Sequence, residues 1–570
     1  MTKKLKEKSI RAGDSANLPA SSRELMSELF AISGSEALNR ILEYDDPKPL
    51  IQNLAKVDFL WLIKKIGETD SLPILKIASA EQWQYMLDME IWQRDRLDLN
   101  QISTWLDRFQ QADPERLIRW LYSDGQYLTY YYFFKTIQVE IKEGDEVYDL
   151  PDDFFTLDNL YYIRILDKEH EEIIENILRK MAQEDYERYQ ALLLGLVGVL
   201  PVEAEENMHR MRNVRLAEDG FLPYDEAISI YSHLNADSLQ ESGSEYKAYD
   251  ISVDDTLELV PFTHLDHAMG NDLLAKCFSR ITDNRFLDRI RLEFAGLCNQ
   301  ILSADSLRVD DIKVLVNVCR KAAGYINIGL ERLSADDIDS SEQYLKKNPL
   351  ISFFRVGFGV ALELRWEAER WIKDAWFIRE GLKPDFWGDE WDGVLVGILQ
   401  KRPCFYVGFQ EGTTYRGFEK LSEIEDCRII LHHIIVLDRL LNILTAKHHL
   451  DRDRVKDPFL TFYPLLFNLW ARVRLKLDPG FSSLSLDQVR DFFKLLRSKG
   501  QRPPYRMPGF KKTFIRDIMS YATDFEHDTA NRLKETLSLI WEKFVEEYSW
   551  VGTTDIDERY TKFIITKPSS

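Results

Sequence analysis

The stretch from Leu50 to Ile137 alternates short apolar segments of helical periodicity with strong helix stops, and it constrains the fold more than any other feature of the chain. Within it, the segment from Asp58 to Ile66 partly repeats in the segment from Asp113 to Leu121. The matching positions are Asp58/Asp113, Leu62/Leu117, Ile63/Ile118, Lys64/Arg119 and Ile66/Leu121, with Leu54/Phe109 one turn earlier. Helices this short are marginal in isolation, so they have to be stabilised by stacking on their neighbours. We therefore expect a small α-solenoid, an architecture that typically presents a surface to a partner.

Capping residues mark the helix boundaries in this stretch. Ser79-Ala-Glu-Gln82 has the form of a capping box, in which the first and fourth side chains each bond to the other residue's backbone N–H. Asp113-Pro114 combines a cap with a proline at the first helical position, where a missing N–H costs little. We also expect caps at Asp58, Asp98 and Ser485.

Two later segments favour strands in a chain that is otherwise helical in pattern. Phe154 to Ile165 has β-favouring residues on both sides of Asp158-Asn159, which predicts a hairpin. The runs 405–409 and 414–418 can pair around the turn at 410–412. The predicted fold class is therefore mainly α, with an N-terminal short-helix α-solenoid followed by larger helical domains with minor β-hairpins.

Shifts in composition indicate where domains begin and end. The chain becomes acidic and loses its periodicity from Glu140 to Pro151, and residues 235–254 are rich in Ser, Glu, Asp and Gly. The predicted parts are a flexible basic tail at 1–22, a helical-repeat domain at 23–145, a helical domain with a β-hairpin at 146–240, an aromatic-rich helical body with minor β at 255–450, and a C-terminal helical region at 451–570.

The charge balance argues against nucleic acid and anionic membranes as main partners. The chain of 570 residues carries a formal net charge of -21, and phosphate groups would repel it. A basic cluster occurs only in the tail, at Lys3, Lys4, Lys6, Lys8 and Arg11. No apolar core follows these lysines, so we do not expect a secretory signal.

The remaining composition favours a cytoplasmic protein with no membrane span. The most apolar run, Ala191 to Leu200, has half the length that a bilayer requires and is expected to be a buried helix. The five cysteines form no Cys-x-x-Cys pair, which favours reduced thiols over a disulfide framework or a zinc knuckle.

Some of these segments resemble a known family. The block Leu62-Ile-Lys-Lys-Ile-Gly67, the segment 75–82 with Leu87-Asp88 and Trp92, and Arg215 to Phe221 resemble an uncharacterised bacterial family catalogued as a domain of unknown function. That resemblance covers most of the chain and implies no activity. The capped short helices at 50–137 also resemble the cytosolic helical domain of magnesium transporters and its relative in flagellar motor switch proteins. This second resemblance implies protein contacts and not magnesium transport.

The catalytic candidates lie in the Trp-rich region 350–418. Glu363 and Glu367 share a helix face, and a buried carboxylate pair with Arg365 nearby could act in acid–base chemistry or bind a metal. A salt-bridged helix surface is the ordinary alternative. Arg355-Val-Gly-Phe-Gly359 resembles a glycine-rich phosphate turn, but it lacks the lysine of a P-loop, which favours close helix packing instead.

Histidine pairs are the candidate metal ligands. His264 and His267 lie one helical turn apart, and His432 and His433 lie on another predicted helix. Zinc sites need ligands that converge from separate elements, and no fixed spacing links these pairs. We therefore predict no metal and no cofactor. Arg210, Arg212 and Arg215 form a basic run that is ordinarily a solvated face, with a dock for an acidic partner segment as the alternative.

These patterns predict a cytoplasmic helical adaptor or assembly protein that docks a protein partner through its solenoid and has no assignable catalysis. The alternative is an enzyme or a ligand-sensing regulator with a pocket in the Trp-rich region 350–418. The sequence leaves the partner and the oligomeric state open.

Overall fold

The computed structural model describes residues 28–29, 31–93, 95–142, 151, 153–196, 201–218, 221–240, 272–307, 312–410, 413–450, 457, 460–498, 500–507, 509–557 and 561–567. Helices dominate these residues, and the strands form small sheets, so the predicted mainly α class is confirmed. The chain divides into two compact units, residues 1–355 and 356–570. Helix α21, Leu350–Ile372, contains the point of division, which lies inside the predicted part 255–450.

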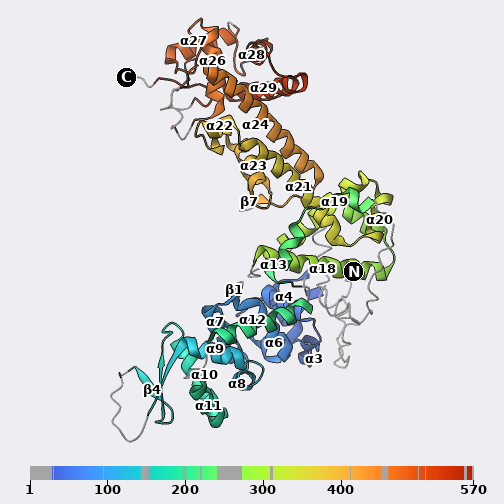
Figure 1. The fold of residues 1–570 in the computed structure, drawn as a ribbon, viewed down its shortest axis with the longest axis vertical. Helices are drawn as coiled ribbons and strands as arrows, with labels where there is room; N and C mark the ends of the chain where they lie inside the picture. The colour runs from blue at the N-terminus through green and yellow to red at the C-terminus, as the bar shows by residue number, and fades with distance from the viewer. Residues whose placement is uncertain are drawn as a thin grey trace, which may run out of the picture. The chain divides into compact units, whose positions relative to one another are not determined.

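The N-terminal unit begins with short helices, coloured blue to cyan in Figure 1. Their bounds are α2 Gly34–Leu42, α3 Pro47–Gln52, α4 Lys56–Ile66, α5 Leu72–Ile77, α6 Ala80–Glu90, α7 Leu99–Ala112, α8 Pro114–Leu121 and α9 Gln126–Thr136, with the two-residue strands β1 Trp92–Gln93 and β2 Arg96–Leu97 between α6 and α7. Helices α2 to α8 pack mostly on helices one or two places along the chain, whereas α9 packs most on the later helix α12. Three later helices, α10 Glu171–Glu184, α11 Tyr186–Leu196 and α12 Pro201–Glu218, return to pack on α7, α8 and α9.

The apolar positions of the two copies of the sequence repeat are buried in the same way. Leu62 and its counterpart Leu117 are both fully buried, and Ile63 and Ile118 are equally enclosed. Asp113 caps α8 by accepting a hydrogen bond from the backbone N–H of Arg116, as predicted. Its counterpart Asp58 does not cap α4, so that prediction was wrong; the helix starts two residues earlier and Asp58 lies in its first turn.

The other predicted caps are present. Ser79 forms a capping box with Gln82, and Ser485 forms one with Gln488. Asp98 accepts hydrogen bonds from two backbone N–H groups in the first turn of α7. Local side-chain chemistry therefore defines these helix starts, as the sequence indicated.

The first predicted hairpin is part of a three-stranded antiparallel sheet. Strands β4 Phe154–Thr156 and β5 Tyr161–Ile165 pair around Asn159, whose φ of 58° suits the turn. Strand β3 Ile137–Ile141 pairs with the other edge of β5, giving the order β3-β5-β4. The sheet therefore spans the position of the boundary expected at residue 145.

Helix α12 is held to α6 by the basic run, which is not the free solvated face that we expected. The carboxylate of Asp88 is almost fully buried and accepts hydrogen bonds from Nε and Nη2 of Arg215, at 2.6 and 2.7 Å. Arg212 donates from Nε to the backbone carbonyl of Asp88 at 2.7 Å. Burial lowers the pKa of Arg212 to about 10. These arginines serve an internal contact, and the third, Arg210, is exposed.

Replacing Arg215 with lysine is expected to lower the free energy of unfolding of the full chain by about 1 kcal/mol. Lysine keeps the positive charge beside Asp88 but replaces the planar two-point contact by a single donor. Urea denaturation followed by circular dichroism measures the change. Arg210→Lys, in the same basic run but exposed, should leave the midpoint unchanged. Equal effects of the two substitutions would contradict this role of Arg215.

The rest of the N-terminal unit is built on longer helices. Its elements are α13 Tyr224–Ala227, the 3₁₀ helix η1 Ile228–Tyr231, α14 Asp237–Gln240, α17 Leu273–Arg280, α18 Asn284–Asp305, α19 Ile312–Ser334 and α20 Ile338–Lys347. Helix α19 lies against the start of α21 at Gly329, where an added Cβ would stand 2.2 Å from the carbonyl oxygen of Phe353. Glycine is required there because two backbones meet.

The C-terminal unit is organised around the longest helix, α24 Leu421–Lys447. The other elements are α22 Trp376–Arg379, the 3₁₀ helix η2 Pro384–Trp387, α23 Asp389–Leu399, the strands β6 Phe405–Gln410 and β7 Thr413–Arg416, α26 Phe462–Arg474, α27 Leu486–Leu496, α28 Phe510–Met519 and α29 His527–Tyr548. Helix α24 packs against α22, α23 and α29. Strands β6 and β7 form the second predicted hairpin.

Helix α24 is also the one helix among the described residues that is long and apolar enough to cross a membrane. Its most apolar window has a mean hydropathy of 1.6, and half of that window is buried inside the protein. Core helices of soluble proteins pass the same test, and α24 makes hydrogen bonds through buried Asp438 and His433. We therefore assign α24 to the core.

Candidate functional site

The catalytic candidates on α21 do not form a site of their own. Glu363 is exposed, and Arg365 bonds to Glu369 at 2.7 Å on the same helix and to the carbonyl of Lys401. Glu367 turns toward another helix, α24. The glycine-rich segment at 355–359 lies within α21 and not between a strand and a helix, so the phosphate-turn interpretation does not fit.

Glu367 and His432, which were separate candidates in the sequence, lie together. Nε2 of His432 and Oε1 of Glu367 are 2.6 Å apart, and Nε of Arg428 is 3.6 Å from the other carboxylate oxygen. The hydrogen bond to His432 lowers the pKa of Glu367. No third His, Cys or carboxylate converges with these two to hold a metal within the described residues. The arrangement is an ion-pair contact between α21 and α24.

The other candidate histidines lie apart from this contact. His433 is buried and stacks on Trp391. Its Nδ1 shares a 2.8 Å hydrogen bond with the hydroxyl of Thr536. Burial lowers its pKa, which favours the neutral ring. His264 and His267 lie outside the described residues.

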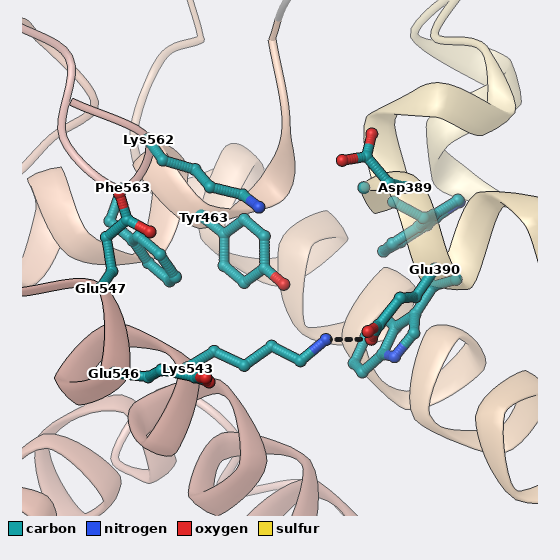
Figure 2. Close-up of a pocket in the computed structure, with 11 residues that line it drawn as sticks. Asp389, Glu390, Tyr463, Lys543, Glu546, Glu547, Lys562 and Phe563 are labelled. Atoms are coloured by element: carbon teal, nitrogen blue, oxygen red, sulfur yellow. Dashed lines mark hydrogen bonds and ion pairs between the residues drawn. The ribbon is translucent and has the colours of Figure 1, made fainter. Parts of the chain in front are cut away.

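A pocket of about 440 Å³ lies elsewhere in the C-terminal unit, and sequence reasoning did not identify most of its residues. Figure 2 shows the side chains that line it. They are Trp387, Gly388, Asp389, Glu390, Trp391, Tyr463, Lys543, Glu546, Glu547, Lys562 and Phe563. They come from the junction of η2 and α23, from α26, from α29 and from the segment after it.

Gly388 shapes the first wall of the pocket. Its φ of 78° reverses the chain between η2 and α23, a conformation that side-chain-bearing residues rarely adopt. Trp387 ends η2 on one side of this reversal, and Trp391 is the third residue of α23 on the other. Asp389 and Glu390 lie in the first turn of α23, where the positive end of the helix dipole stabilises their negative charge.

The buried part of the lining is aromatic. Trp387, Trp391, Tyr463 and Phe563 are each at most 7% exposed. Burial, reinforced by Glu390 and Asp389, raises the pKa of Tyr463, so its hydroxyl stays protonated. Within the described residues, the buried Nε1 of Trp387 has no hydrogen-bond acceptor. This nitrogen has almost no accessible surface, so the indole contributes its ring and not its N–H to the pocket wall.

The exposed part of the lining is charged. Lys543 of α29 forms an ion pair with Glu390 of α23, marked by the dashed line in Figure 2. Nζ of Lys562 lies 5.9 Å from the ring centroid of Tyr463. Asp389, Glu546 and Glu547 complete the charged lining. Buried aromatic rings thus lie behind a pocket surface that is mostly polar, an arrangement that suits a small polar ligand.

Part of this site had a signal in the sequence. The predicted Trp-rich region contributes Trp387 to Trp391, where an acidic helix start follows a glycine. The opposite wall comes from positions 463 and 543–563, which carry no motif. Only the packing of α26 and α29 reveals that they face the same space.

Comparison with known proteins gives one match. The model of a family of unknown function (DUF6178) matches residues 14–567. No curated protein and no solved structure matches the chain. The expected membership in a domain-of-unknown-function family is confirmed, and the resemblance to magnesium transporter and motor switch domains stays a prediction. The chain belongs to the DUF6178 family of unknown function.

Proposed function

We propose that the C-terminal unit binds a small polar ligand and that the protein acts as a ligand-sensing regulator. The observation that supports this proposal is the 440 Å³ pocket, which combines a buried aromatic lining with a charged mouth. Its volume is in the range of small-molecule sites. The Lys543–Glu390 ion pair already joins two elements across it, so a ligand that replaces this contact would change how α23 and α29 are held.

A small polar molecule that fits the pocket is expected to raise the melting temperature of the full-length protein. Isothermal titration calorimetry should show its binding. Anionic, neutral and cationic compounds of matched size should be compared. Tyr463→Phe removes only the pocket hydroxyl, and we expect it to weaken a ligand bonded there by about three- to tenfold. Tyr189→Phe, a buried tyrosine of the N-terminal unit, is the matched control and should leave binding unchanged. A screen in which no compound of any charge class binds would contradict the proposal.

A second candidate function is the cytoplasmic adaptor, with the short helices α3 to α9 as a solenoid-like docking surface. A small hollow between α6, α9 and α12 supports it, because its rim exposes two large apolar side chains. Tyr127 is 45% exposed and Met211 is 40% exposed. Exposed apolar groups around a hollow are typical of protein contacts. A pull-down in which Tyr127→Ser and Met211→Ser lose a partner that the wild type retains would support docking there.

A further inference from the structure

The charges at the pocket mouth favour a positively charged ligand. Four carboxylates, Asp389, Glu390, Glu546 and Glu547, face two ammonium groups, those of Lys543 and Lys562, an excess of two negative charges. Within the described residues, three of these carboxylates make no hydrogen bond or ion pair through their side chains; only Glu390 does, with Lys543. Charges of one sign around a concave site attract the opposite charge.

The pocket already holds ammonium groups that belong to the protein. Lys543 reaches from α29 to the carboxylate of Glu390, which is 72% exposed in its side chain. Lys562 places its ammonium group near the face of Tyr463. Carboxylates and aromatic faces are the two chemistries that bind organic ammonium ions in water. The pocket therefore contains both a carboxylate and an aromatic face that already bind an ammonium group, in each case that of a lysine.

The Lys543–Glu390 contact is one that a ligand can replace. Both side chains are more than a third exposed, and ion pairs of this kind contribute little net stability because water competes for both partners. This replaceable ion pair and the buried aromatic residues behind it distinguish the pocket from a solvated cluster of acidic side chains.

We propose that the pocket binds an organic ammonium compound of the diamine class, and that Lys543 is its internal competitor for Glu390. This inference rests on the proposed function, since it names the ligand class of the same pocket. The ligand's ammonium group takes the place of the Lys543 ammonium on Glu390. Its methylene chain lies against the aromatic lining, and a second ammonium group faces the remaining carboxylates.

The test compares three probes of equal length that differ in charge: 1,5-diaminopentane, 1,5-pentanediol and glutarate. Isothermal titration calorimetry on the full-length protein is expected to show binding of the diamine, weakening as ionic strength rises. Glu390→Gln should weaken diamine binding by about tenfold. Lys543→Met should strengthen it by about three- to tenfold, because the internal competitor is gone.

The control is a matched ion pair outside the pocket. Nζ of Lys511 on α28 lies 2.6 Å from Oε1 of Glu542 on α29, and Lys511→Met should leave diamine affinity unchanged. An unchanged thermal unfolding midpoint shows that Lys543→Met is folded. Weaker or equal diamine binding by Lys543→Met would overturn the competitor role. Binding of glutarate or pentanediol in preference to the diamine would overturn the ligand class while the proposed function stands, whereas failure of every charge class contradicts the proposed function itself.

Discussion

Replacing Asp438 with alanine is expected to lower the free energy of unfolding of the C-terminal unit by about 3–5 kcal/mol. The carboxylate is buried on α24 and accepts hydrogen bonds from the backbone N–H groups of Trp376 and Phe377, each at 3.0 Å. It thereby holds the start of α22. Hydrogen bonds to a charged acceptor contribute about 1.5–3 kcal/mol each, and their loss leaves buried donors unpaired. Urea denaturation followed by tryptophan fluorescence measures the change.

Two variants test whether the effect comes from these hydrogen bonds. Asp438→Asn keeps an acceptor oxygen and should lose less stability than Asp438→Ala. Asn442→Ala lies one turn further along α24 and removes only an exposed contact with Arg379, so we expect a loss of less than about 0.5 kcal/mol. If Asp438→Ala were no more destabilising than Asn442→Ala, Asp438 would not anchor α22.

Replacing Asp58 with asparagine is expected to stabilise the protein at pH 8 by about 2 kcal/mol. Burial raises the pKa of Asp58 from the ordinary 3.8 of an aspartate to about 7. The folded state therefore binds the proton of the Asp58 carboxyl group more tightly than the unfolded state does. The contribution of this proton to the free energy of unfolding is fully present below about pH 4 and is lost as the pH rises to about 7. At 1.36 kcal/mol per pKa unit, a shift of this size would lower the free energy of unfolding by about 4 kcal/mol once Asp58 is ionised. Because the side chain is only partly buried, we expect about half of this loss.

The pH dependence is the decisive measurement. The difference in unfolding free energy between Asp58→Asn and the wild type should be small at pH 4 and should grow up to pH 8. The sequence repeat supplies the control, because Asp113 occupies the matching position but caps α8. Asp113→Asn keeps a good cap and should show little of this pH dependence. A difference that stays flat from pH 4 to pH 8 would show that Asp58 is ionised in the folded protein.

Local interactions explain why the sequence predicted the helix boundaries so well. The boxes at Ser79 and Ser485 and the turn at Asn159 depend on residues within a few positions of each other. Asp58 is the informative exception. It matches Asp113 in the repeat, but α4 begins earlier and places this carboxylate where burial opposes its charge. Tertiary packing therefore altered the role of one copy without altering its buried apolar positions.

The candidate sites show where pattern reasoning stops. Glu367 and His432 were each selected from a local motif, yet their 2.6 Å contact joins two helices far apart in the chain. The basic run at 210–215 has the composition of a solvated face, but two of its arginines donate hydrogen bonds to the buried residue Asp88. In both cases the partner is set by helix packing, which local spacing does not encode.

The sequence by itself determined the mainly α class, the capped short helices, both hairpins and family membership, because periodicity and capping act between neighbouring residues. Only the tertiary structure decided that Trp387, Tyr463 and Lys543 surround one pocket. The physical reason is that their proximity is produced by the burial of α23, α26 and α29 against a common core, and such burial depends on the whole unit.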